Sequence, residues 1–523
     1  MNRSEMMSRV AARTSPWDML VIGGGATGVG IAVDAAARGY DILLLEQNDF
    51  GKGTSSRSTK LIHGGVRYLQ QGNVALVMDA LKERGCLRAN APHLVHDMAF
   101  VVPNYDWWEA PFYGIGLKVY DLLAGRYGFG PSKRLSKQET LERIPNIRQE
   151  GLRGGIIYHD GQFDDARLLI NLARTAAHQG ATVINYAPVT RLIKDDQGYV
   201  EGATFTDAET GEVHHVRAKV VINATGPFAD DVRHMDDAQA QAMIAPSQGI
   251  HLVFDGSFLP GKSAIMVPHT KDGRVMFAIP YLGATLVGTT DTPITQCDLE
   301  PRPMAPEIDF ILETAGTYLE KVPTRKDIRS MFAGIRPLVK AAEDAPTATL
   351  SRDHTIHISR SGMITIAGGK WTTYRQMAEE CIDHALALTD LPLRSCATKS
   401  LNIHGYHKTP EKFGPLALYG ADAPALNDLL DADPARRERL HPRMPTLAGE
   451  VLWAVRFEAA RTVDDFLARR TRSLLLDARA AWEMAPGVAA VMAKELGRDA
   501  AWRDRQVAAF QQLAATYLPE GSD

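Results

Sequence analysis

The sequence has few cysteines, no long apolar run and no excess of positive charge. Its 523 residues include four cysteines, none in a C-x-x-C pair, so neither a disulfide scaffold nor a cysteine-ligated metal site is expected. No stretch has the roughly 18 consecutive apolar residues of a membrane-spanning helix, and the N-terminus lacks the apolar core of a secretory signal. A formal net charge of -4 argues against a general nucleic-acid-binding protein. We therefore expect a cytoplasmic protein that binds no metal and no nucleic acid.

The length and the order of the patterns predict an α/β (α+β) protein with more than one domain. A chain of this size is too long for a single hydrophobic core. Short, turn-punctuated apolar runs over 247–349 predict an antiparallel sheet, which 76–155 is expected to complete as a substrate-binding part. Composition shifts near residue 397, after which Ala, Leu, Arg and Glu recur at helical spacing. We expect one domain over 17–397, with the substrate sheet inserted in it, and a helical domain over 398–523.

A dinucleotide-binding pattern occupies residues 18–46, DMLVIGGGATGVGIAVDAAARGYDILLLE. A buried strand leads into Gly23, Gly25 and Gly28 at G-x-G-x-x-G spacing, and a helix rich in small apolar residues follows. Such glycines allow a tight turn, a close approach to a pyrophosphate and helix–strand packing, while the helix N-terminus stabilises the phosphate charge. Glu46 ends the next strand, close to the spacing of about 20 residues typical of a ribose-binding acid. An unphosphorylated ribose, and hence FAD or NAD, is favoured over NADP.

Two later glycine-ended strands favour FAD over NAD. KVVINATGPFADDV (219–232) is a strand that runs into A-T-G. MITIAGGKWTTYRQMAEECI (363–382) is a strand, a Gly-Gly turn and a helix whose N-terminus suits the negative charge of a reduced flavin. Three returns of the chain to one long cofactor predict a Rossmann-like domain that is discontinuous in sequence.

Two helical segments carry further expectations. In 160–180 we expect a helix capped by Asp164 or Asp165 and ended at Gly180. The segment 107–125, WWEAPFYGIGLKVYDLLAG, is apolar and aromatic with few charges. It is either a patch that dips into a membrane surface or a core or interface helix.

Potential catalytic groups gather in the run STKLIHGGVRYL (58–69) and recur in three later places. His251 opens an apolar strand, Arg336 stands between a glycine and a proline in FAGIRPLV, and Lys370 lies in the last Gly-Gly turn. Each signal is weak alone, since a lone histidine is more often structural. Together with TSSRSTKLIHGGVRYL, FDDAR, VVINATGP, GTTDT, GIRPL and GGKWTTYR, they make the chain strongly resemble the FAD-dependent glycerol-3-phosphate dehydrogenases over about 17–518.

The resemblance implies a flavin fold of the glycine-oxidase type and a defined reaction. FAD would be bound without a covalent link, sn-glycerol 3-phosphate would be oxidised to dihydroxyacetone phosphate, and electrons would pass to a membrane quinone. The family's motif residues fall on His251 as general base and on the cations Arg67, Arg336 and Lys370, which suit a phosphate dianion and a reduced flavin. Tyr68 would join these four in contacting the substrate. The cofactor contacts would be Gly23, Gly25, Ala26, Thr27, Gly28, Glu46, Gln47, Thr54, Ser55, Ser58, Lys60, Leu61, His63, Val189, Thr225, Gly226, Arg336, Gly369, Lys370 and Thr372.

Other functions remain open at this point. A glycerol-3-phosphate oxidase that passes electrons to oxygen would share the site motifs, although we see no inserted segment of the kind expected in oxidases. An amine or amino-acid oxidase would need one carboxylate-binding arginine rather than several cations. A non-catalytic flavin module would not need the base. Because quinones reside in lipid, we expect peripheral attachment to the inner face of the cytoplasmic membrane, and the C-terminal helices could pack subunits into a homo-oligomer.

Overall fold

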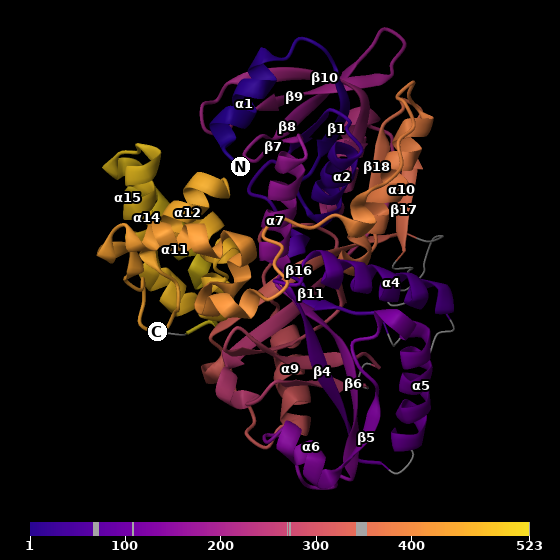
Figure 1. Ribbon diagram of the computed structural model, residues 1–523, viewed down its shortest axis with the longest axis vertical. Helices are drawn as coiled ribbons and strands as arrows, with labels where there is room; N and C mark the ends of the chain where they lie inside the picture. The colour runs from indigo at the N-terminus through magenta and orange to yellow at the C-terminus, as the bar shows by residue number, and fades with distance from the viewer. Residues whose placement is uncertain (66–72, 107–108, 269, 271–272, 341–352, 522–523) are drawn as a thin grey trace.

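Two β-sheets and a C-terminal group of helices make up the part of the chain described by this computed structural model (Figure 1). The described residues are 1–65, 73–106, 109–268, 270, 273–340 and 353–521. Arg67 and Tyr68 lie outside these ranges. The expected α/β class with a C-terminal helical region is confirmed.

The first sheet contains the dinucleotide-binding pattern. Its central strands are parallel, with Leu20 of β1 opposite Val221 of β10 and Leu43 of β2. Helix α2 (Ala26–Ala37) links β1 to β2, and its small residues allow close packing, since a Cβ on Gly30 would lie 2.8 Å from Tyr374. The strand order is β17 (His354–Ile358), β18 (Ile364–Gly368), β10 (Val213–Asn223), β1 (Trp17–Ile22), β2 (Ile42–Leu45) and β7 (Thr182–Ile184). The buried, apolar β1 and β2 agree with the predicted strands.

Antiparallel strands and helices complete this layer. Strands β9 (Val200–Thr206) and β10 form an antiparallel pair, and β9 also pairs with β8 (Val189–Lys194). The predicted 160–180 helix is α7 (Asp165–His178), where the side chain of Asp164 caps the helix by accepting from the Arg167 amide at 3.0 Å. The remaining helices are α1 (Arg3–Ala12), α8 (Ala229–Asp236) and α10 (Tyr374–Ala387).

The second sheet draws its strands from two separated parts of the chain, as predicted from the turn-punctuated runs. It is mainly antiparallel, and β11 pairs with β14 on one side and β16 on the other. The path is β15 (Thr292–Pro293), β11 (Ile244–Asp255), β14 (Ala284–Gly288), β13 (Met276–Tyr281), β12 (Ser263–Val267), β4 (Val95–Asn104), β6 (Gly154–Phe163) and β3 (Leu61–Ile62), with β16 (Ser330–Val339) beside β11 and β5 (Lys133–Ser136) beside β6. The helices of this part are α4 (Val74–Asn90), α5 (Glu109–Ala124), α6 (Lys137–Arg143) and α9 (Ala305–Tyr318).

Helix α5 covers most of the 107–125 segment and combines both expected characters. Tyr113, Leu117 and Tyr120 on one face are buried, whereas Ile115 and Leu122 on the other are 70% and 80% exposed. The segment is therefore a packed helix that also presents an apolar surface.

The C-terminal helices lie beside the first sheet (Figure 1) and are joined to it by buried ion pairs. Arg470 forms a bidentate pair with Asp49, which follows β2, at 2.5 and 2.9 Å, and Arg472 pairs with Asp164 at 2.7 Å. The helices are η9 (Pro410–Asp422), α11 (Ala423–Asp431), α12 (Ala448–Phe457), η11 (Asp465–Arg470), α13 (Ser473–Leu476), α14 (Ala478–Leu496) and α15 (Ala500–Ala515). The Asp49 pair ties the 46–55 loop to the C-terminal helices and the Asp164 pair ties the start of α7 to them, while the domain limit near residue 397 stays a prediction.

Candidate active site

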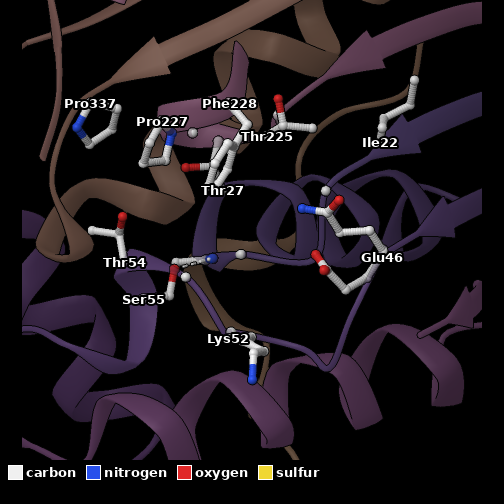
Figure 2. A pocket seen from close by; sticks show the side chains of 18 of the residues that line it. Ile22, Thr27, Glu46, Lys52, Thr54, Ser55, Thr225, Pro227, Phe228 and Pro337 are labelled. Carbon is white, nitrogen blue, oxygen red and sulfur yellow. Dashed lines mark hydrogen bonds between the residues drawn. The ribbon is translucent and has the colours of Figure 1, made fainter. Parts of the chain in front are cut away.

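A cavity of about 520 Å³ lies at the carboxyl ends of β1, β2, β10 and β18, where ligands bind in open α/β sheets. Figure 2 shows Thr54 and Ser55 on one side and Pro227 and Phe228 on the other. The three predicted returns of the chain thus meet at one cavity. The predicted cofactor residues that line it are Gly23, Gly25, Ala26, Thr27, Glu46, Gln47, Thr54, Ser55, Val189, Thr225, Gly226, Gly369 and Lys370.

The glycine turn has the geometry that a bound pyrophosphate needs. Gly23 has a φ of +111°, and a Cβ on it would lie 2.7 Å from the Ala224 carbonyl oxygen. A Cβ on Gly28 would lie 1.9 Å from the carbonyl oxygen of Gly23, so Gly28 supports the turn from below without lining the cavity. Helix α2 begins at Ala26, and its N-cap residue, Gly25, has no side chain that could cover the helix N-terminus. Because Gly25 and Ala26 both line the cavity, the N-terminus faces it. The Ala26 amide donates to Ser55 Oγ at 2.9 Å (Figure 2).

Glu46 stands at the end of β2 with its carboxylate held by two backbone amides. Gly24 donates to Oε2 at 2.6 Å and Asn48 donates to Oε1 at 2.8 Å. Burial raises the pKa of Glu46, and these two hydrogen bonds oppose the rise. The carboxylate keeps further lone pairs for a ribose hydroxyl, so the glycine turn, helix terminus and acid fit an FAD molecule.

Lys370 lies in this larger cavity, directly after a left-handed Gly-Gly turn. Gly368 and Gly369 have φ values of +78° and +76°, and a Cβ on Gly369 would lie 2.4 Å from Met377 Sδ. The short helix η7 (Trp371–Thr373) and α10 follow. The sequence therefore places a cation and a helix start together, as expected for an anionic cofactor.

Three predicted cofactor contacts are placed away from the cavity lining. The Lys60 ammonium group is fully buried and bound to Asp165 Oδ2 at 2.8 Å and to the Ser56 carbonyl at 2.6 Å. Ser58 Oγ donates to the same carboxylate at 2.6 Å, and Thr372 is a buried residue of η7. Lys60 and Ser58 lie elsewhere because the start of α7 brings Asp165 to them.

A smaller cavity of about 180 Å³ lies over the second sheet. Predicted residues Leu61, His63 and Arg336 line it, so these three contact this space rather than the larger cavity. The neighbouring Pro337 lines the larger cavity, so consecutive residues of β16 reach the two spaces. The other residues that line the smaller cavity are Thr59, Gly65, Phe100, Tyr158, Asp160, Met266, Arg274, Val275, Phe277, Thr289, Thr290 and Asp291.

The Arg336 guanidinium group is fixed by oxygen atoms of the 289–291 segment. It donates to the Thr290 carbonyl at 2.9 Å, to Thr289 Oγ1 at 3.2 Å and to Asp291 Oδ1 at 3.2 Å. A Cβ on Gly249 would lie 2.4 Å from its Nη2, so the glycine provides the space for this side chain. Arg336 thereby holds a defined orientation at the cavity.

His251 lies behind the smaller cavity and is 3% exposed. Its ring stacks on Phe332 with centroids 4.9 Å apart, and its Nε2 lies 2.9 Å from Thr59 Oγ1. A Cβ on Gly288 would lie 2.3 Å from the ring. Burial is the largest cause that lowers the pKa of His251 well below its ordinary value, and the charges of Lys60 and Arg336 add to it. The imidazole is therefore neutral at pH 7 and able to accept a proton.

Sequence reasoning missed two residues of this cavity. Thr59 faces the space while contacting His251, but its partner is distant in sequence and no motif marks the pair. Arg274 adds a second cation to the lining, and it stands in a turn without any recognisable spacing. In the sequence, the one signal for Arg274 is its position between Gly273 and the apolar run that forms β13.

Comparisons with known proteins agree with this geometry. Residues 18–375 match the family described as FAD dependent oxidoreductase, and 363–503 match the C-terminal domain of alpha-glycerophosphate oxidase. The chain is therefore an FAD-dependent oxidoreductase, and its cofactor is FAD.

Relatives that align with most of the chain narrow the class of oxidoreductase. The human mitochondrial glycerol-3-phosphate dehydrogenase is 42% identical, with 93% of this chain and 71% of that protein covered. A mitochondrial glycerol-3-phosphate dehydrogenase of Arabidopsis thaliana is 40% identical, with 99% and 89% covered. The structure of the Bacillus halodurans glycerol-3-phosphate dehydrogenase with FAD has a TM-score of 0.81 at 31% identity, with 100% and 98% covered. The chain belongs to the family of FAD-dependent glycerol-3-phosphate dehydrogenases.

Proposed function

We propose that this protein oxidises sn-glycerol 3-phosphate to dihydroxyacetone phosphate and passes the electrons to a membrane quinone. One observation supports this most directly. Of two adjacent residues of β16, Arg336 lines the smaller cavity and Pro337 lines the larger cavity that fits a dinucleotide. A phosphate ester in the first would therefore have its carbon chain next to a cofactor in the second.

The described cations of the two cavities have separate tasks in this proposal. Arg336, fixed at the small cavity, binds the phosphate through its fork of donors, and Arg274 in the same lining adds positive charge. Lys370 lies in the larger cavity and stabilises the negative charge of the reduced cofactor. Arg67 and Tyr68 stay predicted substrate contacts.

A proton path runs from the substrate to His251. The C2 hydroxyl proton passes to Thr59 Oγ1, and the Thr59 proton passes to His251 Nε2 across 2.9 Å. Bound FAD supplies the two-electron acceptor for the hydrogen on C2. The negative charge of the phosphate next to Arg336 offsets the cations that lower the pKa of His251, and so makes the imidazole a stronger base in the complex.

Anaerobic mixing of the FAD-loaded protein with glycerol 3-phosphate tests this function. We expect the yellow colour to bleach within the first turnover and to return when a soluble quinone analogue is added. A protein that stays yellow at saturating substrate contradicts the proposed reaction. Recovery with oxygen as fast as with quinone would instead support the alternative glycerol-3-phosphate oxidase.

The proposed membrane contact is the apolar face of α5, which contains Ile115, Val119 and Leu122. A groove of about 550 Å³ runs along it, and the basic residues Lys118, Lys133 and Arg134 line the same groove. Apolar side chains bordered by cations suit a surface of anionic lipid.

Within the described ranges, no helix is long and apolar enough to cross a bilayer. Attachment to the inner face of the cytoplasmic membrane and assembly into a homo-oligomer both stay predictions, and the human and Arabidopsis relatives above are named mitochondrial.

Replacing Ile115 and Leu122 together with glutamate should lower binding to anionic vesicles about tenfold or more, because two apolar contacts are lost and two repelled charges are added. Cosedimentation with phosphatidylglycerol vesicles measures this. The matched control is Leu393→Glu, at an 84% exposed leucine in a different part of the chain, which should bind like the native protein. Equal binding by all three proteins would rule out α5 as the contact.

A further inference from the structure

Three buried polar side chains form a network beside the smaller cavity: Tyr120 of α5, Arg84 of α4 and Asp160 of β6. Tyr120 Oη donates to Asp160 Oδ2 at 2.8 Å, and Arg84 Nη1 donates to Asp160 Oδ1 at 2.5 Å. All three residues are buried, and Asp160 also lines the cavity. Arg84 thus neutralises a carboxylate that would otherwise repel a phosphate from this side.

The network ends on the backbone of the H-G-G run. The Gly64 amide donates to Tyr120 Oη at 2.9 Å, and Arg84 Nη1 donates to the same oxygen at 3.3 Å. The phenol therefore donates one hydrogen bond and accepts two, which uses its full capacity. Burial and the nearby Asp160 raise the pKa of Tyr120 well above its ordinary value, so the hydroxyl keeps its proton.

Gly64 is packed so closely that its position depends on these side chains. A Cβ on it would lie 2.5 Å from Tyr120 Oη and 2.6 Å from Leu81 Cδ2, both from helices that cover the sheet. The next residue, Gly65, lines the smaller cavity. A shift of the Gly64 amide would thus be passed to Gly65 and would change the wall of that cavity.

We propose that Tyr120 is a positioning residue for substrate binding: held by Asp160 and Arg84, its hydroxyl fixes the Gly64 amide and, through it, Gly65 in the lining of the smaller cavity. The inference rests on the proposed function, because it takes the phosphate ester as the ligand of that cavity. Tyr120 contacts no reacting atom, so its effect belongs to substrate binding rather than to the chemical step.

Tyr120→Phe tests the proposal by removing one oxygen atom. We expect KM for glycerol 3-phosphate to rise roughly tenfold while kcat with an artificial electron acceptor changes less than about threefold. Without substrate, hydrogen exchange at the Gly64 amide should become at least about tenfold faster, because its buried acceptor is gone. The matched control is Tyr419→Phe, a buried phenol that donates to Glu450 at 2.7 Å in the C-terminal helices. It should change neither quantity.

The outcomes separate this inference from the proposed function. Native protein that is not bleached by glycerol 3-phosphate contradicts the function. Native activity together with an unchanged KM and unchanged Gly64 exchange in Tyr120→Phe contradicts the positioning role alone. If that variant does not fold, exchange in the native protein decides: a Gly64 amide that exchanges as fast as an exposed loop overturns the proposal.

Discussion

Replacing His251 with alanine should slow the reduction of bound FAD by glycerol 3-phosphate about 10²–10⁴-fold, the range that general base catalysis supplies. His251 Nε2 is 2.9 Å from Thr59 Oγ1, and Thr59 faces the cavity. Without the imidazole, the C2 hydroxyl proton has no acceptor along this path. Anaerobic stopped-flow absorbance of the flavin measures the rate constant directly.

Two variants show whether the effect comes from the base. His93→Ala removes another buried histidine, which is 3.0 Å from Asn171, and it should leave the reduction rate near the native value. Thr59→Val should resemble His251→Ala, whereas Thr59→Ser should retain most of the rate because the hydroxyl is kept. A native rate in His251→Ala would assign the base to another residue.

The lowered pKa of His251 predicts how activity and stability depend on pH. The neutral imidazole persists in the folded protein below pH 6.5, so flavin reduction at limiting substrate, which reports the free protein, should not fall between pH 7.5 and 6.5 on its account. The unfolded chain binds the proton below about 6.5 and the folded chain does not. Stability from this residue is therefore complete above about pH 6.5 and is lost as the pH falls. The loss reaches about 1.4 kcal/mol at about pH 5.5, and urea unfolding of His251→Ala against the native protein measures it by difference.

Local spacing explains which parts of the fold and site could be predicted from the sequence. Gly23, Gly28 and Glu46 belong to one strand–helix–strand unit, so their positions follow from neighbouring residues. Strand β18 and the Gly-Gly turn before Lys370 are likewise formed by consecutive residues, so they too could be recognised from the sequence.

Contacts between distant segments explain what the sequence did not predict. Lys60 resembles a cofactor-binding cation until Asp165, from the start of α7, is seen to neutralise it. Thr59 acquires its proposed role only because β11 brings His251 to it. The Asp49–Arg470 pair joins segments 421 residues apart and leaves no pattern in either segment.

Replacing Arg336 with alanine should lower kcat/KM for glycerol 3-phosphate by about 10²-fold or more, equal to about 2.8 kcal/mol of transition-state binding. The guanidinium group is oriented by the Thr290 carbonyl and the Asp291 carboxylate, so its fork is fixed before the phosphate arrives. Removal of the side chain also leaves Asp291 without this positive neighbour, which adds to the repulsion of a dianion.

Comparison with glycerol isolates the contribution of the phosphate. Glycerol has no charge, so the native protein and Arg336→Ala should oxidise it at similar low rates, and the difference between the two substrates should shrink about 100-fold in the variant. Arg336→Lys should recover only part of the loss, since a point charge lacks the bidentate geometry. The matched control is Arg329→Ala. Arg329 directly precedes β16, is partly exposed and pairs with Asp255, so this variant should retain native kinetics. An equal loss with both substrates would place Arg336 at the reacting carbon, because only a phosphate contact discriminates between an ester and its parent alcohol.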